Sequence, residues 1–200
     1  MMNKKLILVA SPPACGKTYV SEMIARSVEG MVYLDKDDLS DLIRAAFAVA
    51  GKPLDMDGEF YKSNLRGAEY STILNIAYST LRFEKFVLLN APFGKEVRDT
   101  DTIKALKKRA NDMGAELVLI WISVPTRLCY ERIKKRNSDR DTLKLKNWGE
   151  YVKNINYTPP YQLEKEGAVD KFFVFDNTDG LSAQASLKDA LKIILENNYA

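Results

Sequence analysis

The sequence contains no histidine, and this absence excludes several kinds of catalytic site. A Ser-His-Asp hydrolase needs an imidazole base, and histidine-ligated zinc needs imidazole ligands. Any proton transfer must therefore fall to a carboxylate, a lysine, a tyrosine or a cysteine. The two cysteines, Cys15 and Cys129, are too few for a disulfide framework or a zinc knuckle. We expect both to be reduced thiols.

The sequence also lacks any apolar run long enough to span a membrane. The run Leu6–Ala10 is too short for the core of a signal peptide, so we expect a soluble, cytoplasmic protein without a membrane partner. The net charge of +3 is small and does not demand a nucleic acid. With 46% hydrophobic content over 200 positions, the chain is expected to form one domain, residues 1–200.

Five short apolar runs alternate with segments that have helical periodicity. Continuous apolar runs, in contrast to alternating ones, are typical of a parallel sheet covered on both faces. We therefore predict an α/β fold of three layers, with a five-stranded parallel sheet between helices. The predicted strands are residues 5–10, 31–34, 86–89, 117–122 and 171–175.

A long helix is predicted to start near Asp57, because apolar and small residues recur there at spacings of three and four. These spacings place six side chains on one shared face: Tyr61, Leu65, Ala68, Thr72, Ile76 and Thr80.

The first predicted strand leads into a loop that nearly matches the phosphate-binding motif G-x-x-x-x-G-K-[ST], and a helical pattern follows. In this strand–loop–helix setting the motif indicates phosphate binding. Backbone N–H groups of such a loop curl around an anion at the positive end of the helix dipole. Lys17 is expected to reach the outer phosphates, and the Thr18 hydroxyl is expected to ligate Mg²⁺. The loop sequence is Ser11-Pro12-Pro13-Ala14-Cys15-Gly16-Lys17-Thr18.

Two positions depart from the usual pattern. Ser11 stands where the motif has its first glycine, so the loop must accommodate a Cβ atom. Asn90 ends the third strand, where a Walker-B strand usually ends in an aspartate that helps to hold Mg²⁺. An amide can hydrogen-bond a metal-bound water or a substrate hydroxyl, but it adds no negative charge. This argues against a dedicated ATP-hydrolysing motor.

Aspartates follow the second predicted strand at positions 35, 37 and 38. In a parallel sheet the ligand lies beyond the carboxyl ends of the strands, so these carboxylates face the same crevice as the phosphate loop. Asp37 or Asp35 could accept a proton from an acceptor hydroxyl or orient a metal-bound water. The alternative is that Asp37 or Asp38 caps the following helix.

Arg132, Arg136 and Arg140 follow the fourth strand at intervals of four residues. If this segment is helical, they share one face and could clamp a transferring phosphoryl group. The alternative is a solvated basic helix face. We expect an arginine-bearing lid over about residues 132–147.

A turn after the last strand, containing Asn177 and Thr178, could pack on a purine ring. The residues expected to contact a nucleotide are therefore Ser11, Ala14, Cys15, Gly16, Lys17, Thr18, Tyr19, Asn177 and Thr178.

Taken together, these residues resemble the P-loop kinases of the nucleoside-monophosphate-kinase-like type. The similarity is greatest to the group of polynucleotide 5′-kinase domains, chloramphenicol phosphotransferase and zeta-type toxin kinases, whose uncharacterised members are often labelled AAA family ATPases. The resemblance implies ATP and Mg²⁺ as cofactors. It also implies a general base at Asp37, within Asp37-Asp38-Leu39-Ser40, and lid arginines at Arg132, Arg136 and Arg140.

We therefore predict an ATP- and Mg²⁺-dependent phosphotransferase that acts on a hydroxyl of a small molecule, held near residues 50–70. A polynucleotide 5′-hydroxyl kinase is one alternative, although polynucleotide kinases carry an arginine where this chain has Ser40. A nucleotide-binding switch or toxin-type protein with little turnover is the other, and Ser11 and Asn90 are its support.

Overall fold

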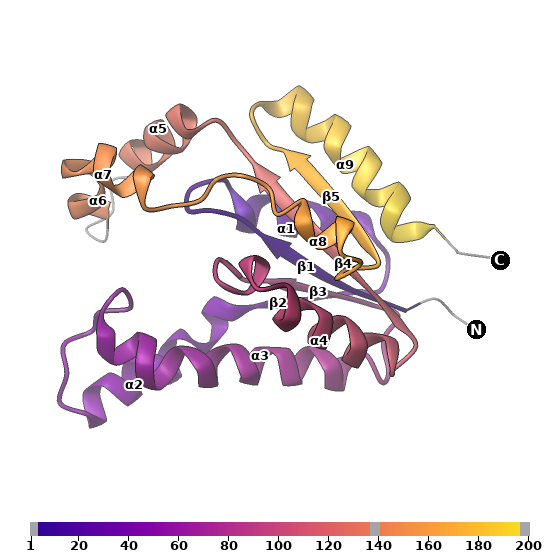
Figure 1. The fold of residues 1–200 in the computed structure, drawn as a ribbon, viewed down its shortest axis with the longest axis horizontal. Helices are drawn as coiled ribbons and strands as arrows, with labels where there is room; N and C mark the ends of the chain where they lie inside the picture. The colour runs from indigo at the N-terminus through magenta and orange to yellow at the C-terminus, as the bar shows by residue number, and fades with distance from the viewer. Residues whose placement is uncertain (1–3, 137–140, 197–200) are drawn as a thin grey trace.

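Five parallel strands form one sheet in the order β2-β3-β1-β4-β5 (Figure 1). The computed structural model describes residues 4–136 and 141–196. The fold prediction is confirmed, and each predicted strand is found with small shifts at its ends. The strands are β1 (Lys4–Ala10), β2 (Met31–Asp35), β3 (Phe86–Asn90), β4 (Ala115–Ser123) and β5 (Lys171–Asp176).

Helices cover both faces of the sheet, so the molecule has three layers (Figure 1). Strand β1 shows why: Leu6 and Leu8 belong to one buried cluster, whereas Ile7 and Val9 belong to another. The first cluster is completed by α3 (Arg66–Thr80) and α4 (Thr100–Asn111). The second is completed by α1 (Lys17–Ser27), α5 (Thr126–Arg136) and α9 (Gly180–Leu195). Because β1 is buried on both sides, its sequence is continuously apolar from Leu6 to Ala10 rather than alternating.

Several short elements lie beyond the carboxyl ends of the strands (Figure 1). They form two groups, one containing α2 and one containing α6 and α7. The group of α2 (Ser40–Val49) includes a 3-10 turn (Lys36–Leu39) and a π-helical turn (Tyr61–Leu65), and the other group is α6 (Thr142–Lys146) with α7 (Trp148–Lys153). Two further short elements belong to neither group: a 3-10 turn (Glu96–Arg98) and α8 (Gln162–Lys165), which contacts α4 and β5.

The helix predicted from near Asp57 differs from its expected form. A π-helical turn, Tyr61–Leu65, precedes α3 and widens the backbone spiral by an extra residue. The buried side of α3 carries Tyr70, Ile73, Ala77 and Tyr78. The predicted face agrees with the structure at Tyr61, which is buried, and at Leu65, which is half-buried, but it is wrong from Ala68 to Ile76. Residues of that face are exposed in the structure: Ala68, Thr72 and Ile76.

None of the helices in the part of the chain that the structure describes combines the length and the hydropathy needed to cross a membrane.

Candidate active site

The loop between β1 and α1 has a backbone that requires glycine at one position. Gly16 has a φ of 84° and a ψ of 32° and stands at the N-terminus of α1, in the left-handed region that favours glycine. A Cβ atom there would lie only 2.5 Å from Nδ2 of Asn177. Ser11 is buried, and its hydroxyl donates to the carbonyl of Pro12 at 2.8 Å. The side chain at the motif's first position is thus accommodated inside the fold.

The carbonyl of Cys15 connects this loop to the far edge of the sheet. It accepts hydrogen bonds from Nδ2 of Asn177 at 2.8 Å and from Nη1 of Arg132 at 3.2 Å. Nη2 of Arg132 also donates to the Asn177 carbonyl at 2.7 Å. Arg132, predicted to contact phosphate, therefore holds the phosphate loop and the β5 turn together.

A cleft of about 470 Å³ lies against the phosphate loop. Four cationic side chains line it, a composition that favours an anionic ligand. The lining residues are Ser11, Pro12, Pro13, Ala14, Gly16, Lys17, Thr18, Tyr19, Asp37, Pro92, Arg132, Arg136 and Lys144.

A second cavity of about 330 Å³ is lined in part by the same residues, Gly16, Tyr19 and Arg132. The turn after β5 and the start of α9 complete its walls. Its further lining residues are Asn177, Asp179, Gly180 and Ala183. Thr178 stands outside both lining sets, and its backbone N–H donates to Asp176 at 2.9 Å. Of the two residues predicted to pack on a purine, Asn177 lines the second cavity and Thr178 lines neither of these two cavities.

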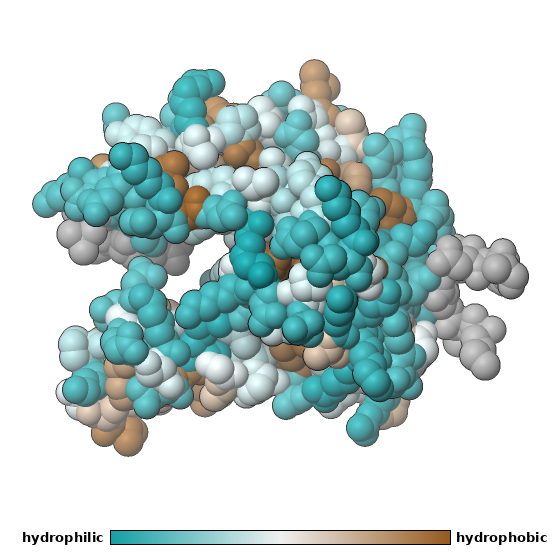
Figure 2. All heavy atoms as spheres, viewed as in Figure 1, coloured by the Kyte–Doolittle hydropathy of each residue, from teal (hydrophilic) through white to brown (hydrophobic). Residues whose placement is uncertain are grey.

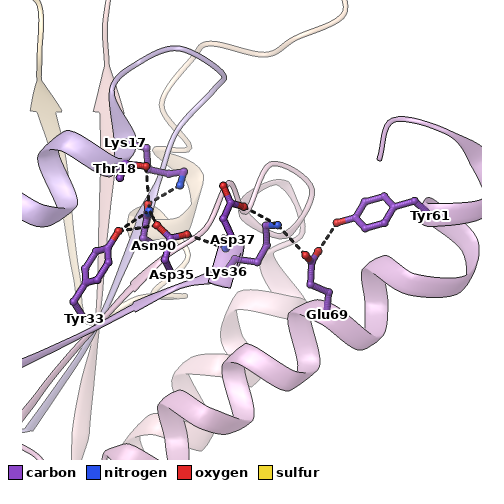
Figure 3. A network of polar contacts seen from close by, with 9 residues as sticks. All are labelled: Lys17, Thr18, Tyr33, Asp35, Lys36, Asp37, Tyr61, Glu69 and Asn90. Atoms are coloured by element: carbon purple, nitrogen blue, oxygen red, sulfur yellow. Dashed lines mark hydrogen bonds and ion pairs between the residues drawn. The ribbon is translucent and has the colours of Figure 1, made fainter. Parts of the chain in front are cut away.

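Asn90 is the centre of a polar network at the carboxyl ends of β2 and β3 (Figure 3). Its side chain is fully buried, and Oδ1 accepts from Nζ of Lys17 at 2.5 Å. Its Nδ2 group lies 2.5 Å from Oδ2 of Asp35, 3.0 Å from the Tyr33 hydroxyl and 3.4 Å from Oγ1 of Thr18. The amide therefore joins the predicted phosphate-contacting lysine and the predicted metal-ligating threonine to β2.

Burial lowers the pKa of Lys17 below its ordinary value of 10.5, although the nearby Asp35 and Asp37 carboxylates oppose this effect. A cation that is poorly solvated and bonded to a neutral amide gains from a more negative partner. The ammonium is thus suited to exchange its contact with Asn90 for a phosphate oxygen.

The two candidate aspartates occupy different surroundings. Asp35 accepts from the backbone N–H of Asp37 at 2.9 Å and from the Tyr33 hydroxyl at 2.7 Å. It is therefore Asp35, and not Asp37 or Asp38, whose side chain caps the following 3-10 turn. The Asp37 side chain is 75% exposed and lines the cleft. Asp37 is accordingly the better placed of the two to meet a substrate hydroxyl.

Arg136 lines the cleft but is already paired. Its Nε and Nη2 groups contact Oδ2 of Asp141 at 2.8 and 2.6 Å. Asp141 is completely buried, and Lys144 lies 3.8 Å from its other oxygen. Arg140, the third predicted lid arginine, lies outside the residues that the structure describes. The described part of the predicted lid thus presents Arg132 and Arg136 on α5, and Lys144, which the sequence did not single out, on α6.

Cys15 is buried and its sulfur lies 3.7 Å from that of Cys129. The hydrogen bond with Cys129 and burial raise the pKa of the Cys15 thiol, so it remains a protonated, space-filling group. Tyr19, in contrast, is largely exposed and lines both cavities.

A second polar network, which the sequence did not indicate, lies beside Asp37 (Figure 3). Nζ of Lys36 lies 3.1 Å from Oδ1 of Asp37 and 3.0 Å from Oε1 of Glu69. The Tyr61 hydroxyl donates to the other oxygen of Glu69. Glu69 is on the buried side of α3, and the correct helical phase of α3 is the only sequence signal that could have placed it there.

The groups that line the cleft at the phosphate loop fit a nucleoside triphosphate with Mg²⁺. The loop precedes the N-terminus of α1, and Lys17 and Arg132 supply cations at the cleft. Among residues 4–136 and 141–196, no three His, Cys, Asp or Glu side chains are grouped as a metal site. Mg²⁺ is commonly held by one or two protein oxygens together with phosphates and water, and Thr18 provides such an oxygen.

Comparison with known proteins gives a family and a fold. The model of a family described as AAA domain matches residues 6–156. A search of curated proteins finds no match.

Three solved structures illustrate the similarity of fold. One is a provisionally assigned kinase from Chloroflexus aurantiacus, with 17% identity, a TM-score of 0.64 and coverage of 97% of this chain and 100% of that one. Kti12 from Chaetomium thermophilum, solved with ADP-AlF3, has 16% identity, a TM-score of 0.59 and coverage of 96% and 100%. Shikimate kinase from Bacteroides thetaiotaomicron has 15% identity, a TM-score of 0.53 and coverage of 96% and 99%. The predicted P-loop kinase fold is confirmed.

Proposed function

Because the chain belongs to the AAA domain family, we propose that it is a kinase, which transfers the γ-phosphate of ATP to a hydroxyl of a small molecule with the help of Mg²⁺. One observation carries this proposal: Lys17 and Asp37 line the same cleft of about 470 Å³. A phosphate-binding ammonium and an exposed carboxylate at one cleft are the two groups that phosphoryl transfer to an alcohol requires.

The phosphate loop and Arg132 are proposed to hold the nucleotide. The backbone N–H groups that lead to the N-terminus of α1 bind the β- and γ-phosphates, and Lys17 leaves Asn90 to contact the γ-phosphate. Thr18 would hold Mg²⁺, which neutralises charge on the β- and γ-oxygens when it is bound. The cavity at Asn177 and Gly180 accommodates the nucleoside.

Asp37 is proposed to accept the proton of the acceptor hydroxyl as the hydroxyl oxygen bonds to the γ-phosphorus. The bond from the γ-phosphorus to the β,γ-bridging oxygen breaks in the same step, and ADP leaves. Asp35 stays in place through its bonds to Tyr33, Asn90 and the Asp37 backbone. It thereby fixes the turn that presents Asp37 and supplies negative charge close to Thr18. The reaction consequently needs no histidine.

The acceptor is proposed to occupy a neighbouring cavity of about 610 Å³, which shares Pro13 and Lys144 with the nucleotide cleft. This cavity lies between residues 57–62 and residues 144–155, where Figure 2 shows a hollow in the surface between the α2 group and the α6–α7 group. Its other lining residues are Asp57, Lys62, Asn147, Glu150, Tyr151, Asn154 and Ile155.

The charges of this cavity favour a small molecule over a polynucleotide. Lys62 and Lys144 are opposed by Asp57 and Glu150 in the same lining. Single-stranded nucleic acid is normally held in a positively charged groove with stacking aromatic residues. A balanced, amide-rich pocket with one tyrosine is better suited to a polar alcohol that makes several hydrogen bonds.

A second candidate is a nucleotide-binding switch with little turnover. It is favoured by the neutral Asn90 at the end of β3 and by the pairing of Arg136 with Asp141, since both reduce the charge available to a transition state.

The test is phosphoryl transfer from radiolabelled ATP to D-gluconate, shikimate, uridine and a 5′-hydroxyl oligonucleotide. We expect a labelled small alcohol with the wild type, none with Lys17→Ala, and a 10²- to 10⁴-fold lower kcat with Asp37→Asn. Nucleotide binding without any labelled product would favour the switch, whereas label only on the oligonucleotide would favour a polynucleotide kinase. Equal turnover by the wild type and Lys17→Ala would overturn the kinase proposal.

A further inference from the structure

Lys36 and Glu69 form an ion pair that is buried in the interior of the protein. Their side chains are 6% and 0% exposed, and Nζ of Lys36 lies 3.0 Å from Oε1 of Glu69. They come from different elements, since Lys36 begins the turn after β2 and Glu69 lies on α3 (Figure 3). The Tyr61 hydroxyl occupies the second oxygen of Glu69. Every oxygen of this buried carboxylate therefore has a donor.

Stability alone is a weak reason for such a pair. Removing two charges from water is costly, and well-packed apolar residues often serve as well or better. The second contact of Lys36 suggests another role, because its ammonium also lies 3.1 Å from Oδ1 of Asp37. The lysine of the buried pair thus also contacts the carboxylate of the proposed catalytic base.

We propose that Lys36 is a positioning residue for the Asp37 carboxylate, and that Glu69 and Tyr61 fix Lys36 in this role. The inference rests on the proposed function, in which Asp37 accepts the proton of the acceptor. An exposed ion pair normally contributes little, because two flexible side chains must be ordered to form it. Here the lysine is already ordered by burial and by Glu69, so only the short Asp37 side chain remains to be ordered.

The backbone of Asp37 is held as well. Its N–H group donates to Oδ1 of Asp35 at 2.9 Å. One aspartate therefore fixes the main chain and one lysine fixes the carboxylate, on a residue whose side chain is three-quarters exposed. A general base must stand within hydrogen-bond reach of the proton that it removes, and a displacement of about 1 Å can reduce the rate about 10²-fold.

The same network reaches the proposed acceptor cavity. Tyr61 is the first residue of the π-helical turn, and its neighbour Lys62 lines that cavity. Such turns occur frequently at functional sites. The widened turn places the Tyr61 hydroxyl on Glu69, eight residues further along the chain. The position of the base is thereby tied to the segment that contacts the acceptor.

The test uses a double substitution, Lys36→Met with Glu69→Gln, which leaves no unpaired buried charge. We measure kcat and KM with the small alcohol that gives the highest turnover in the transfer assay. We expect kcat to fall about 10- to 100-fold while the KM for ATP stays within about twofold. Tyr61→Phe should give a smaller decrease in the same direction. The control, Lys107→Met with Asp170→Asn, removes a partly buried ion pair between α4 and the residue before β5. Neither residue lines the cavities of the site, so kcat should stay unchanged.

A combined variant separates positioning from mere structure. If Lys36 acts through Asp37, the double substitution should cause no further loss of kcat in an Asp37→Asn background. Multiplying losses would instead mean a structural role and would overturn the inference, as would an unchanged kcat in the double variant of an active enzyme. If the wild type transfers phosphate to no alcohol, the proposed function itself fails and the inference fails with it.

Discussion

Asp35, the last residue of β2, is in register with Asn90, the last residue of β3, and the Asn90 amide lies 2.5 Å from its carboxylate. The acidic group that commonly ends β3 in P-loop proteins is thus present one strand away. Asn90 links it to Oγ1 of Thr18 and to Nζ of Lys17. The site therefore keeps one carboxylate near the phosphate loop, although the residue at the end of β3, where that carboxylate usually stands, is the neutral Asn90.

The variant Asn90→Asp should therefore be destabilised. Two carboxylates would face each other where the amide now donates to Asp35 and Tyr33, and each lost buried bond costs about 1 to 3 kcal/mol. Thermal unfolding should show a lower midpoint and partial recovery with added Mg²⁺. The exchanged pair, Asp35→Asn with Asn90→Asp, should recover at least half of the lost stability. Equal midpoints for all three proteins would contradict this account.

Gly16→Ala should abolish nucleotide binding. The new Cβ atom would lie 2.5 Å from Asn177 Nδ2, and the φ of 84° is unfavourable for alanine. Gly114→Ala is the matched control, because Gly114 has a φ of 73° but no atom within 4 Å of its Cβ position. The control should lose about 1 to 2 kcal/mol of unfolding free energy and still bind ATP, as measured by calorimetry. Normal ATP binding by Gly16→Ala would show that the loop can rearrange freely.

Arg132→Ala should weaken ATP binding about 10- to 100-fold. The guanidinium donates to the Cys15 and Asn177 carbonyls, and charged donors of this kind contribute about 1.5 to 3 kcal/mol each. Arg127→Ala removes an exposed arginine of the same helix, paired with Glu131, and should bind ATP like the wild type. Similar affinities for the two variants would argue against a role of Arg132 in shaping the loop.

Lys17 should take up a proton when ATP binds in alkaline solution. Burial lowers its pKa below 10.5 in the free protein, and a bound triphosphate favours the charged form. The lowered pKa also affects the stability of the free protein, and there a rise in pH is favourable. Between the lowered pKa and 10.5 the unfolded chain binds more protons, so stability rises with pH across that window.

Calorimetry in two buffers of different ionisation enthalpy measures this proton uptake directly. Lys17→Met should remove it, whereas Lys108→Met, a change on the exposed side of α4, should not. Uptake that persists in Lys17→Met would assign the proton to another group.

The strands and the phosphate loop could be predicted from the sequence because their signals are local. A strand covered on both faces must be apolar throughout, as Leu6–Ala10 is, and the loop motif is contiguous up to Thr18. The buried side of α3 could also have been predicted, because Tyr70, Ile73, Ala77 and Tyr78 have ordinary helical spacing. What residue spacing does not reveal is the π-helical turn that precedes α3.

The contacts of the site were less predictable for a related reason. Lys36 and Glu69 are 33 residues apart, and each is of a residue type that is normally exposed. Arg136 was expected to face phosphate, and only the structure shows that it pairs with Asp141, five residues later. Asp37 was identified by its position after β2, but only the structure shows that Asp35 is the residue that caps the turn.

The bond between the Asn177 side chain and the Cys15 carbonyl spans 162 positions of the chain. Its partners emerge early and late in synthesis, so this contact of the phosphate loop cannot form before β5 and the turn after it have been made. Contacts between such distant segments form slowly, because a long stretch of chain must first be ordered. Competence to bind nucleotide should thus arise late in folding, after β5 has docked, and ligand capture would serve as a reporter of the completed sheet.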